Sequence, residues 1–127
     1  MAGEPILVVD DNPAQLRLLS AVLEATGHPV RLAPDADEAV AILKTFRPRL
    51  ILMDIQLPGI DGLTLTRMIK ANPSLRDILI VGVTAYAMAE DEDRVRAAGC
   101  DGYLSKPYDT RALPNVIASY LHPTVGH

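Results

Sequence analysis

Residues 50–62 have the sequence LILMDIQLPGIDG, in which four apolar residues and an aspartate precede a stretch rich in proline and glycine. An apolar run without alternation is typical of a strand that is covered on both faces of a parallel sheet. The proline and glycines that follow predict a loop. This stretch therefore predicts a central strand of a parallel sheet, with Asp54 at its carboxyl end.

The same order of strand and then helix occurs five times along the chain. The other strands are predicted at residues 6–9, 29–33, 78–83 and 102–105. Helices are predicted at residues 13–25, 35–46, 63–70, 88–98 and 109–121. In the second helix, capped by Asp35, Val40 and Leu43 are expected to face the core, and Pro114 is an alternative start for the last helix. Right-handed crossovers then give a doubly wound α/β sandwich.

Length and composition exclude several classes of protein. A chain of 127 residues with 49% apolar residues suits one domain, with a core at about residues 5–121. The net charge of −4 and the absence of a basic run argue against direct binding of nucleic acid. No apolar run reaches the ~20 residues of a membrane span, and no signal peptide is recognisable, so a cytoplasmic protein is expected. The single cysteine, Cys100, is interpreted as a small buried core residue.

Polar residues follow four of the five predicted strands. Asp10 and Asp11 end the first, Asp54 the third, Thr84 the fourth and Lys106 the fifth. The carboxyl ends of parallel strands meet at one edge of the sheet, where ligands bind in this class of fold. The second strand ends in Ala33 and Pro34, so it is expected at the margin, away from the site.

Three carboxylates at one edge repel one another unless a cation lies between them. Asp10, Asp11 and Asp54, with a main-chain carbonyl near Gln56, offer the oxygen ligands that Mg²⁺ (or Mn²⁺) prefers. The alternative is that Asp10 or Asp11 only caps the following helix.

Asp54 can attack a phosphoryl group as a nucleophile and form an acyl phosphate. Lys106 can neutralise the charge of the incoming group, and the Thr84 hydroxyl can donate a hydrogen bond to it. Of the three lysines, Lys106 alone follows a strand, whereas Lys44 and Lys70 are interpreted as solvated surface residues.

Four motifs together resemble the receiver domain of response regulators in two-component signalling. They are Val9-Asp10-Asp11-Asn12, residues 52–62, Val83-Thr84-Ala85 and Ser105-Lys106-Pro107. The resemblance spans about residues 5–121 and implies a flavodoxin-like (βα)5 sandwich with strand order 2-1-3-4-5, an order for which such a receiver is a known example. Residues 53–58 and 84–88 look closest to single-domain regulators of bacterial cell-cycle pathways and to receivers of hybrid histidine kinases.

The resemblance also implies partners and a switch. A histidine kinase or phosphotransfer protein would donate the phosphoryl group to Asp54, making the chain a signalling phosphoacceptor that catalyses only its own phosphorylation and dephosphorylation. Phosphorylation would move Thr84 and Tyr103 and change the surface formed by the fourth helix, fifth strand and fifth helix, where a target protein binds. The Lys106–Pro107 peptide bond is implied to be cis.

The sequence leaves the roles of two further pairs of residues undecided. Gln56 and Tyr86 each follow a site residue by two positions, so they would flank the path of attacking water. Tyr86 either shields the acyl phosphate or only covers the sheet edge. Gln15 and Leu18, three residues apart in the first helix, form a contact surface for the phosphodonor unless Leu18 belongs to the core.

Three other functions are less compatible with the residues. A dinucleotide-binding domain needs glycines after the first strand, where this chain has Asp10-Asp11-Asn12-Pro13. A phosphatase with an aspartyl nucleophile needs a second acid where Gln56 stands. An interaction module that is never phosphorylated does not need the complete set of acids, Thr84 and Lys106.

Overall fold

The computed structural model describes residues 3–57, 59–84, 89–106 and 109–122. These residues contain five parallel strands in the order β2-β1-β3-β4-β5. The strands are β1 (Ile6–Val9), β2 (Val30–Ala33), β3 (Leu50–Asp54), β4 (Leu79–Thr84) and β5 (Gly102–Ser105). The doubly wound α/β fold and its strand order are therefore confirmed.

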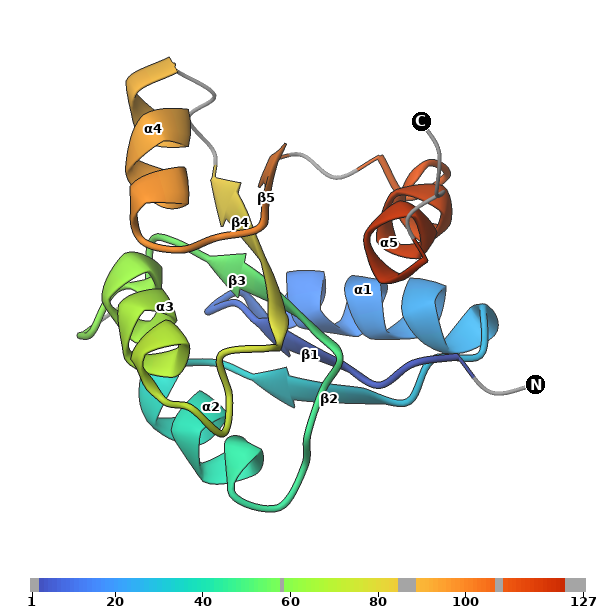
Figure 1. The fold of residues 1–127 in the computed structure, drawn as a ribbon. Coiled ribbons are helices and arrows are strands. Elements are labelled where there is room, and N and C mark those ends of the chain that lie inside the picture. The colour runs from blue at the N-terminus through green and yellow to red at the C-terminus, as the bar shows by residue number, and fades with distance from the viewer. Residues whose placement is uncertain (1–2, 58, 85–88, 107–108, 123–127) are drawn as a thin grey trace.

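Helices cover both faces of this sheet, as Figure 1 shows. The helices are α1 (Pro13–Ala25), α2 (Ala36–Leu43), α3 (Gly62–Ala71), α4 (Ala89–Ala97) and α5 (Leu113–Leu121). One core lies under α1 and α5, and the other lies under α2, α3 and α4. Strands β1 and β3 are buried at every position, because both of their faces are covered. None of the described helices is long and apolar enough to cross a membrane.

The register of the strands determines which residues meet at the carboxyl edge. Val9 pairs with Met53, which places Asp10 level with Asp54 on the neighbouring strand. Thr84 pairs with Ser105, which places Lys106 just beyond the end of β4. The polar residues that the sequence predicted at the strand ends therefore lie together at the carboxyl edge of the sheet.

Helix α2 differs from its prediction at both its inner face and its end. Val40 was expected to face the core but is 37% exposed, and Ala36 and Ala39 are buried instead. Ala36, Ala39 and Leu43 are spaced by three and four residues, so they share the stripe that meets the sheet, and Val40 lies outside it. The helix also ends at Leu43 rather than 46, and Phe46 is half-buried with the Arg31 guanidinium 5.5 Å from its ring centre.

The last two helices show how proline and glycine set helix ends. Helix α5 begins at Leu113 with Pro114 in its first turn, as the alternative start predicted. Asp109 instead forms a turn in which its Oδ1 accepts from the main-chain nitrogen of Arg111 at 3.0 Å. Gly99 closes α4 with a φ of 107°, a left-handed conformation that favours glycine. Met88, the predicted start of α4, lies outside the described residues.

Candidate functional site

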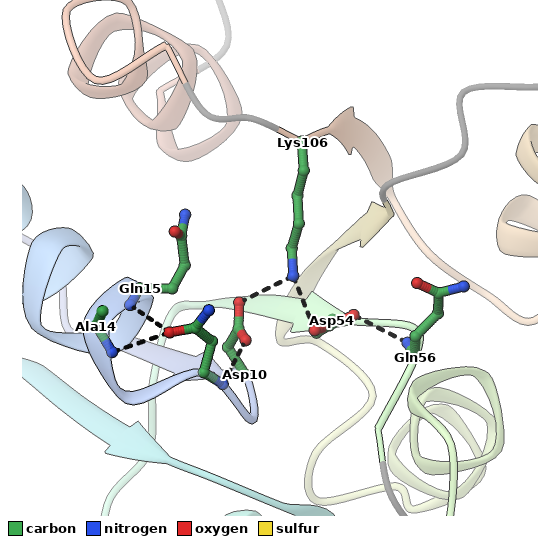
Figure 2. Close-up of polar contacts among 7 residues, drawn as sticks. Asp10, Ala14, Gln15, Asp54, Gln56 and Lys106 are labelled. Carbon is green, nitrogen blue, oxygen red and sulfur yellow. Dashed lines mark hydrogen bonds and ion pairs between the residues drawn. The ribbon is translucent and has the colours of Figure 1, made fainter.

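Asp54 is held at the end of β3 by contacts to both of its carboxylate oxygens (Figure 2). Its side chain is 3% exposed. The main-chain nitrogen of Gln56 donates to Oδ1 at 2.9 Å, and the Lys106 ammonium donates to Oδ2 at 3.0 Å. A carboxylate that is fixed from both sides and faces the open edge is well placed to act as a nucleophile.

Lys106 reaches from the end of β5 across the carboxyl edge, and Figure 2 shows its ammonium between Asp10 and Asp54. Its main-chain nitrogen donates to the Thr84 carbonyl at 2.7 Å, which ties it to the end of β4. Burial alone would lower the pKa of this ammonium, but the hydrogen bond to Asp54 and the charges of Asp54 and Asp10 outweigh burial and raise it. Lys106 therefore stays charged throughout the neutral range.

Asp10 is fully buried, and one of its oxygens has no hydrogen-bond donor among the described residues. Oδ1 accepts from the main-chain nitrogen of Asn12 at 2.9 Å. Oδ2 lies 3.3 Å from Lys106 Nζ, a distance for an ion pair but without the geometry of a hydrogen bond. A buried oxygen of this kind is uncommon and calls for a ligand or ion.

The exposed Asp11 completes an acidic cluster with Asp10 and Asp54. One carboxylate oxygen from each of the three lies within 4.8 Å of the others. Oxygen ligands so close together suit a hard divalent cation such as Mg²⁺. The buried Oδ2 of Asp10 gives such a cation a ligand that no described hydrogen-bond donor occupies.

The cap of α1 resolves the alternative reading of Asp10 and Asp11. Asn12, and not either aspartate, caps the helix, because its Oδ1 accepts from the main-chain nitrogens of Ala14 at 3.0 Å and Gln15 at 3.2 Å. The alternative that Asp10 or Asp11 only caps this helix is therefore wrong. Because Asn12 performs this role, the carboxylates of Asp10 and Asp11 remain available to the site.

Gly62 positions the site in a way that the sequence did not reveal. A Cβ atom at this position would lie 2.1 Å from the Asp54 carbonyl oxygen and 2.7 Å from the Ile55 Cα. Only glycine lets α3 begin this close to the end of β3. In the sequence Gly62 was recognised only as a turn residue. The sequence does not show that a glycine is needed there because the backbone of β3 lies so close.

Thr84 and Tyr103 lie on the same face of the sheet on neighbouring strands. Tyr103 pairs with Gly82, and Thr84 pairs with Ser105, two residues further along both strands. Thr84 is 1% exposed, and Tyr103 is partly buried against the core under α2, α3 and α4. Tyr86 and the Lys106–Pro107 bond, also singled out by the sequence, involve residues outside those described.

The remaining predicted residues divide between surface and core. Leu18 is 45% exposed on α1, so it is not a core residue, and Gln15 is partly exposed. Cys100 is buried, as predicted, and burial raises the pKa of its thiol.

Lys70 is not the solvated surface lysine that the sequence suggested. Its side chain is 21% exposed, and its ammonium donates to the Arg76 carbonyl at 3.2 Å, the Ile78 carbonyl at 2.9 Å and Asp101 Oδ2 at 2.9 Å. The two carbonyls lie in the turn before β4 and Asp101 lies 31 residues away, and no sequence pattern predicts these contacts.

Known proteins are similar to this chain in sequence and in fold along most of its length. A family model described as the response regulator receiver domain matches residues 6–118. The polar-differentiation response regulator DivK of Brucella anthropi is 40% identical over 116 residues, which cover 91% of this chain and 94% of that protein.

Two solved receiver domains of histidine kinases are also similar. The one from Pseudomonas aeruginosa, which has a magnesium ion coordinated in its active site cleft, is 35% identical with a TM-score of 0.85, covering 94% of this chain and 98% of that one. The one from Syntrophus aciditrophicus is 31% identical with a TM-score of 0.86, covering 98% of this chain and 95% of that one. By its family match, its relatives and its fold, the chain belongs to the response regulator receiver domains of two-component signalling.

Proposed function

We propose that this receiver is a signalling phosphoacceptor in which Asp54 takes a phosphoryl group from a histidine kinase or phosphotransfer protein. The observation that carries the proposal is the buried Asp54 carboxylate, held by Gln56 and Lys106 beside the acidic pair Asp10 and Asp11. Lys106 can balance only one of these three negative charges. The site is therefore suited to a reaction that brings a cation and a phosphoryl group together.

The proposed transfer forms one bond and breaks another. A carboxylate oxygen of Asp54 attacks the phosphorus, and the phosphorus–nitrogen bond to the donor imidazole breaks. The electron pair of that bond stays on the imidazole nitrogen, which then takes up a proton. The product is an acyl phosphate on Asp54, whose phosphorus–oxygen bond is later cleaved by water. Lys106 and the Thr84 hydroxyl would stabilise the oxygens of the transferred group.

The same proposal assigns Mg²⁺ (or Mn²⁺) to the acidic cluster. Asp10, Asp11 and Asp54 would hold the ion, together with the main-chain carbonyl of Gln56. When bound, it supplies positive charge to the phosphoryl oxygens. The buried Oδ2 of Asp10 and the magnesium ion in the similar Pseudomonas receiver support this assignment.

Substitution of the acceptor tests the function directly. Asp54→Asn keeps the shape of the side chain and should abolish labelling by a small phosphodonor such as acetyl phosphate with Mg²⁺, measured by intact-protein mass spectrometry. Asp101→Asn, at the opposite edge of the sheet, should label like the parent. Undiminished labelling of Asp54→Asn would refute the assignment. An unlabelled parent would indicate an interaction module, and donor turnover without a labelled product would indicate a phosphatase.

Phosphorylation is further proposed to act on the surface of α4, β5 and α5 through Thr84 and Tyr103. The register supports this route, because the two residues share one face of neighbouring strands. Phosphate on Asp54 would draw the Thr84 hydroxyl toward it, and Tyr103 would turn further into the core, at a coupling of about 1–3 kcal/mol. Thr84→Ala should then accept phosphate without moving Tyr103. NMR spectra of Tyr103 with and without a phosphate mimic would test this, and equal shifts in parent and variant would exclude Thr84 as the relay.

A further inference from the structure

An apolar groove of about 360 Å³ runs between α2 and α3, on the face of the sheet away from α1 and α5. Its apolar lining is Val40, Leu43, Leu65, Met68, Ile69 and Leu75. Leu65 and Ile69 are buried and form its floor, whereas Val40 is 37% exposed and Met68 49% exposed at its rims. Isolated exposed apolar residues are ordinary, but a lined groove with apolar rims is typical of a binding surface.

The groove exists because the two helices pack on different strands. Helix α2 contacts β1 and β2, and α3 contacts β3 and β4. The fully buried contacts of α2 are made by Ala36 and Ala39, whose small side chains leave the larger Val40 directed outward. The space between the helices is therefore a consequence of how each helix meets the sheet, and the apolar rims have no described partner there.

One end of the groove is cationic in a chain whose net charge is −4. Lys44 lines the groove, and Arg47 donates a hydrogen bond to the carbonyl of Ser74, another lining residue. Arg76 follows the lining residue Leu75 and is exposed. Asp77, the acidic residue that follows Arg76 in the sequence, shares a small hollow with Arg47. The opposite end of α2 is acidic, with Asp37 in its first turn.

We infer that this groove binds an amphipathic helix of a partner protein, with apolar side chains along one face and acidic residues at one end. Apolar side chains would lie between Val40 and Met68, and the acidic end would meet Lys44, Arg47 and Arg76. A helix laid in an apolar groove between two helices is a recurrent mode of recognition. The difference in charge between the two ends of the groove fixes the direction of the bound helix.

This surface is separate from the phosphoacceptor. The groove is lined by the middle and C-terminal turns of α2 and α3 and by residues 74–75, whereas Asp54 lies where α3 begins. Substitutions in the groove are therefore expected to leave labelling of Asp54 unchanged, and binding to the groove does not require phosphate.

The test uses two synthetic helical peptides with the same row of leucines, one with glutamates at one end and the other with lysines there. Fluorescence anisotropy measures their affinity for the parent protein. The glutamate peptide should bind about tenfold more tightly than the lysine peptide. The double variant Lys44→Glu/Arg76→Glu should reverse this preference.

A matched pair of apolar substitutions locates the binding surface. Met68→Gln should weaken binding of the glutamate peptide about tenfold, because it removes an apolar rim. Leu18→Gln, at a residue of similar exposure on α1, should leave the affinity unchanged. NMR shifts induced by the peptide should appear in Val40 and Met68.

The inference is wrong if the glutamate peptide fails to bind, if the parent protein binds the two peptides with equal affinity, or if the NMR shifts are confined to residues outside the groove. Sedimentation distinguishes a second copy of the chain as the occupant. If the parent self-associates and Met68→Gln abolishes the association, the groove is an interface between copies and the inference is wrong.

Discussion

Two partly buried lysines, at opposite edges of the sheet, differ in how their charge is balanced. The side chains of Lys70 and Lys106 are 21% and 26% exposed, and each ammonium lies about 3 Å from an aspartate oxygen, at 2.9 and 3.0 Å. Lys70 donates to two carbonyls and one carboxylate, which uses all three of its hydrogens. Lys106 faces two buried carboxylates, with Asp11 beside them.

The difference separates a structural contact from a site that can react. At the Lys70 edge, Asp101 Oδ2 also accepts from the main-chain nitrogen of Ile80 at 2.9 Å, so the pair is matched and hydrogen-bonded. At the Lys106 edge the negative charge exceeds the positive, and the Asp10 Oδ2 has no described hydrogen-bond donor. An excess of one charge at a buried position costs stability, and a bound ligand of the opposite charge would offset that cost.

The largest expected effect is on phosphorylation when Lys106 is removed. Lys106→Met should slow labelling by a small phosphodonor about 100-fold, because it removes a charge that stabilises the transferred group. Mass spectrometry over time measures the rate. Lys44→Met, at an exposed lysine, is the control. A Lys106→Met protein that labels at the parent's rate would show that Lys106 has no role in phosphoryl transfer.

Magnesium should stabilise the protein by binding at the carboxyl edge and not at the opposite edge. At a concentration 100 times its dissociation constant, a bound ion raises the free energy of unfolding by about 2.7 kcal/mol. Asp11→Ala should abolish this rise and relieve repulsion in the metal-free protein. Asp77→Ala, at an exposed aspartate of the opposite edge, should keep the rise. Thermal unfolding with and without Mg²⁺ gives the answer, and an undiminished response in Asp11→Ala would contradict the cluster as the metal site.

Lys70→Met should lower the free energy of unfolding by about 2 kcal/mol, since it takes a charged donor from two carbonyls and Asp101. Labelling of Asp54 should be unchanged. Urea unfolding measures the first quantity and mass spectrometry the second. If Lys70→Met also slowed labelling, the two edges would be coupled, and the separation of their roles would fail.

The smallest effect concerns the caps of two helices, of which only α3 begins against the site. Asp61→Ala and Asp35→Ala should each cost about 1 kcal/mol, because each carboxylate accepts from a main-chain nitrogen three residues on. Only Asp61→Ala should also slow labelling of Asp54.

Acidity gives a second readout of the Asp61 cap. The hydrogen bond from the main-chain nitrogen of Thr64 is the largest cause that lowers the pKa of Asp61. A lowered pKa in the folded state means that the stabilisation is present above the ordinary value of 3.8 and is lost as the pH falls through the folded pKa. The stability difference between parent and Asp61→Ala should therefore shrink on acidification below pH 3.8, and a constant difference would show that the cap does not depend on charge.

The sequence predicted the fold closely where apolar runs are long and bounded by turn residues. The strand at residues 6–9 and the helix at 13–25 have the predicted limits. Val40 was misplaced because helical spacing alone does not show whether alanine or valine meets the sheet. The candidate site was predictable because parallel strands bring their ends together. The contacts of Lys106 with Asp10 and Asp54 were not predictable in detail, because they join residues far apart in the sequence.

The cap of α1 and the contacts of Lys70 differ in how far the sequence could predict them. The helix was predicted to begin at Pro13, so Asn12, the residue directly before it, already held the N-cap position, and the structure places the cap there. Lys70 had no local signal because its acceptors lie in the turns before β4 and β5.

The order in which the edge is assembled has a consequence for synthesis on the ribosome. Lys106 lies 52 residues after Asp54 in the chain. At ordinary translation rates, it is made roughly 3 to 10 seconds later than Asp54. During that interval β1 and β3 can pair only by bringing Asp10 close to Asp54 without the ammonium that separates them in the finished protein. Divalent cations should therefore assist cotranslational folding of the first half more than refolding of the complete chain, a difference that arrested nascent chains of increasing length would reveal.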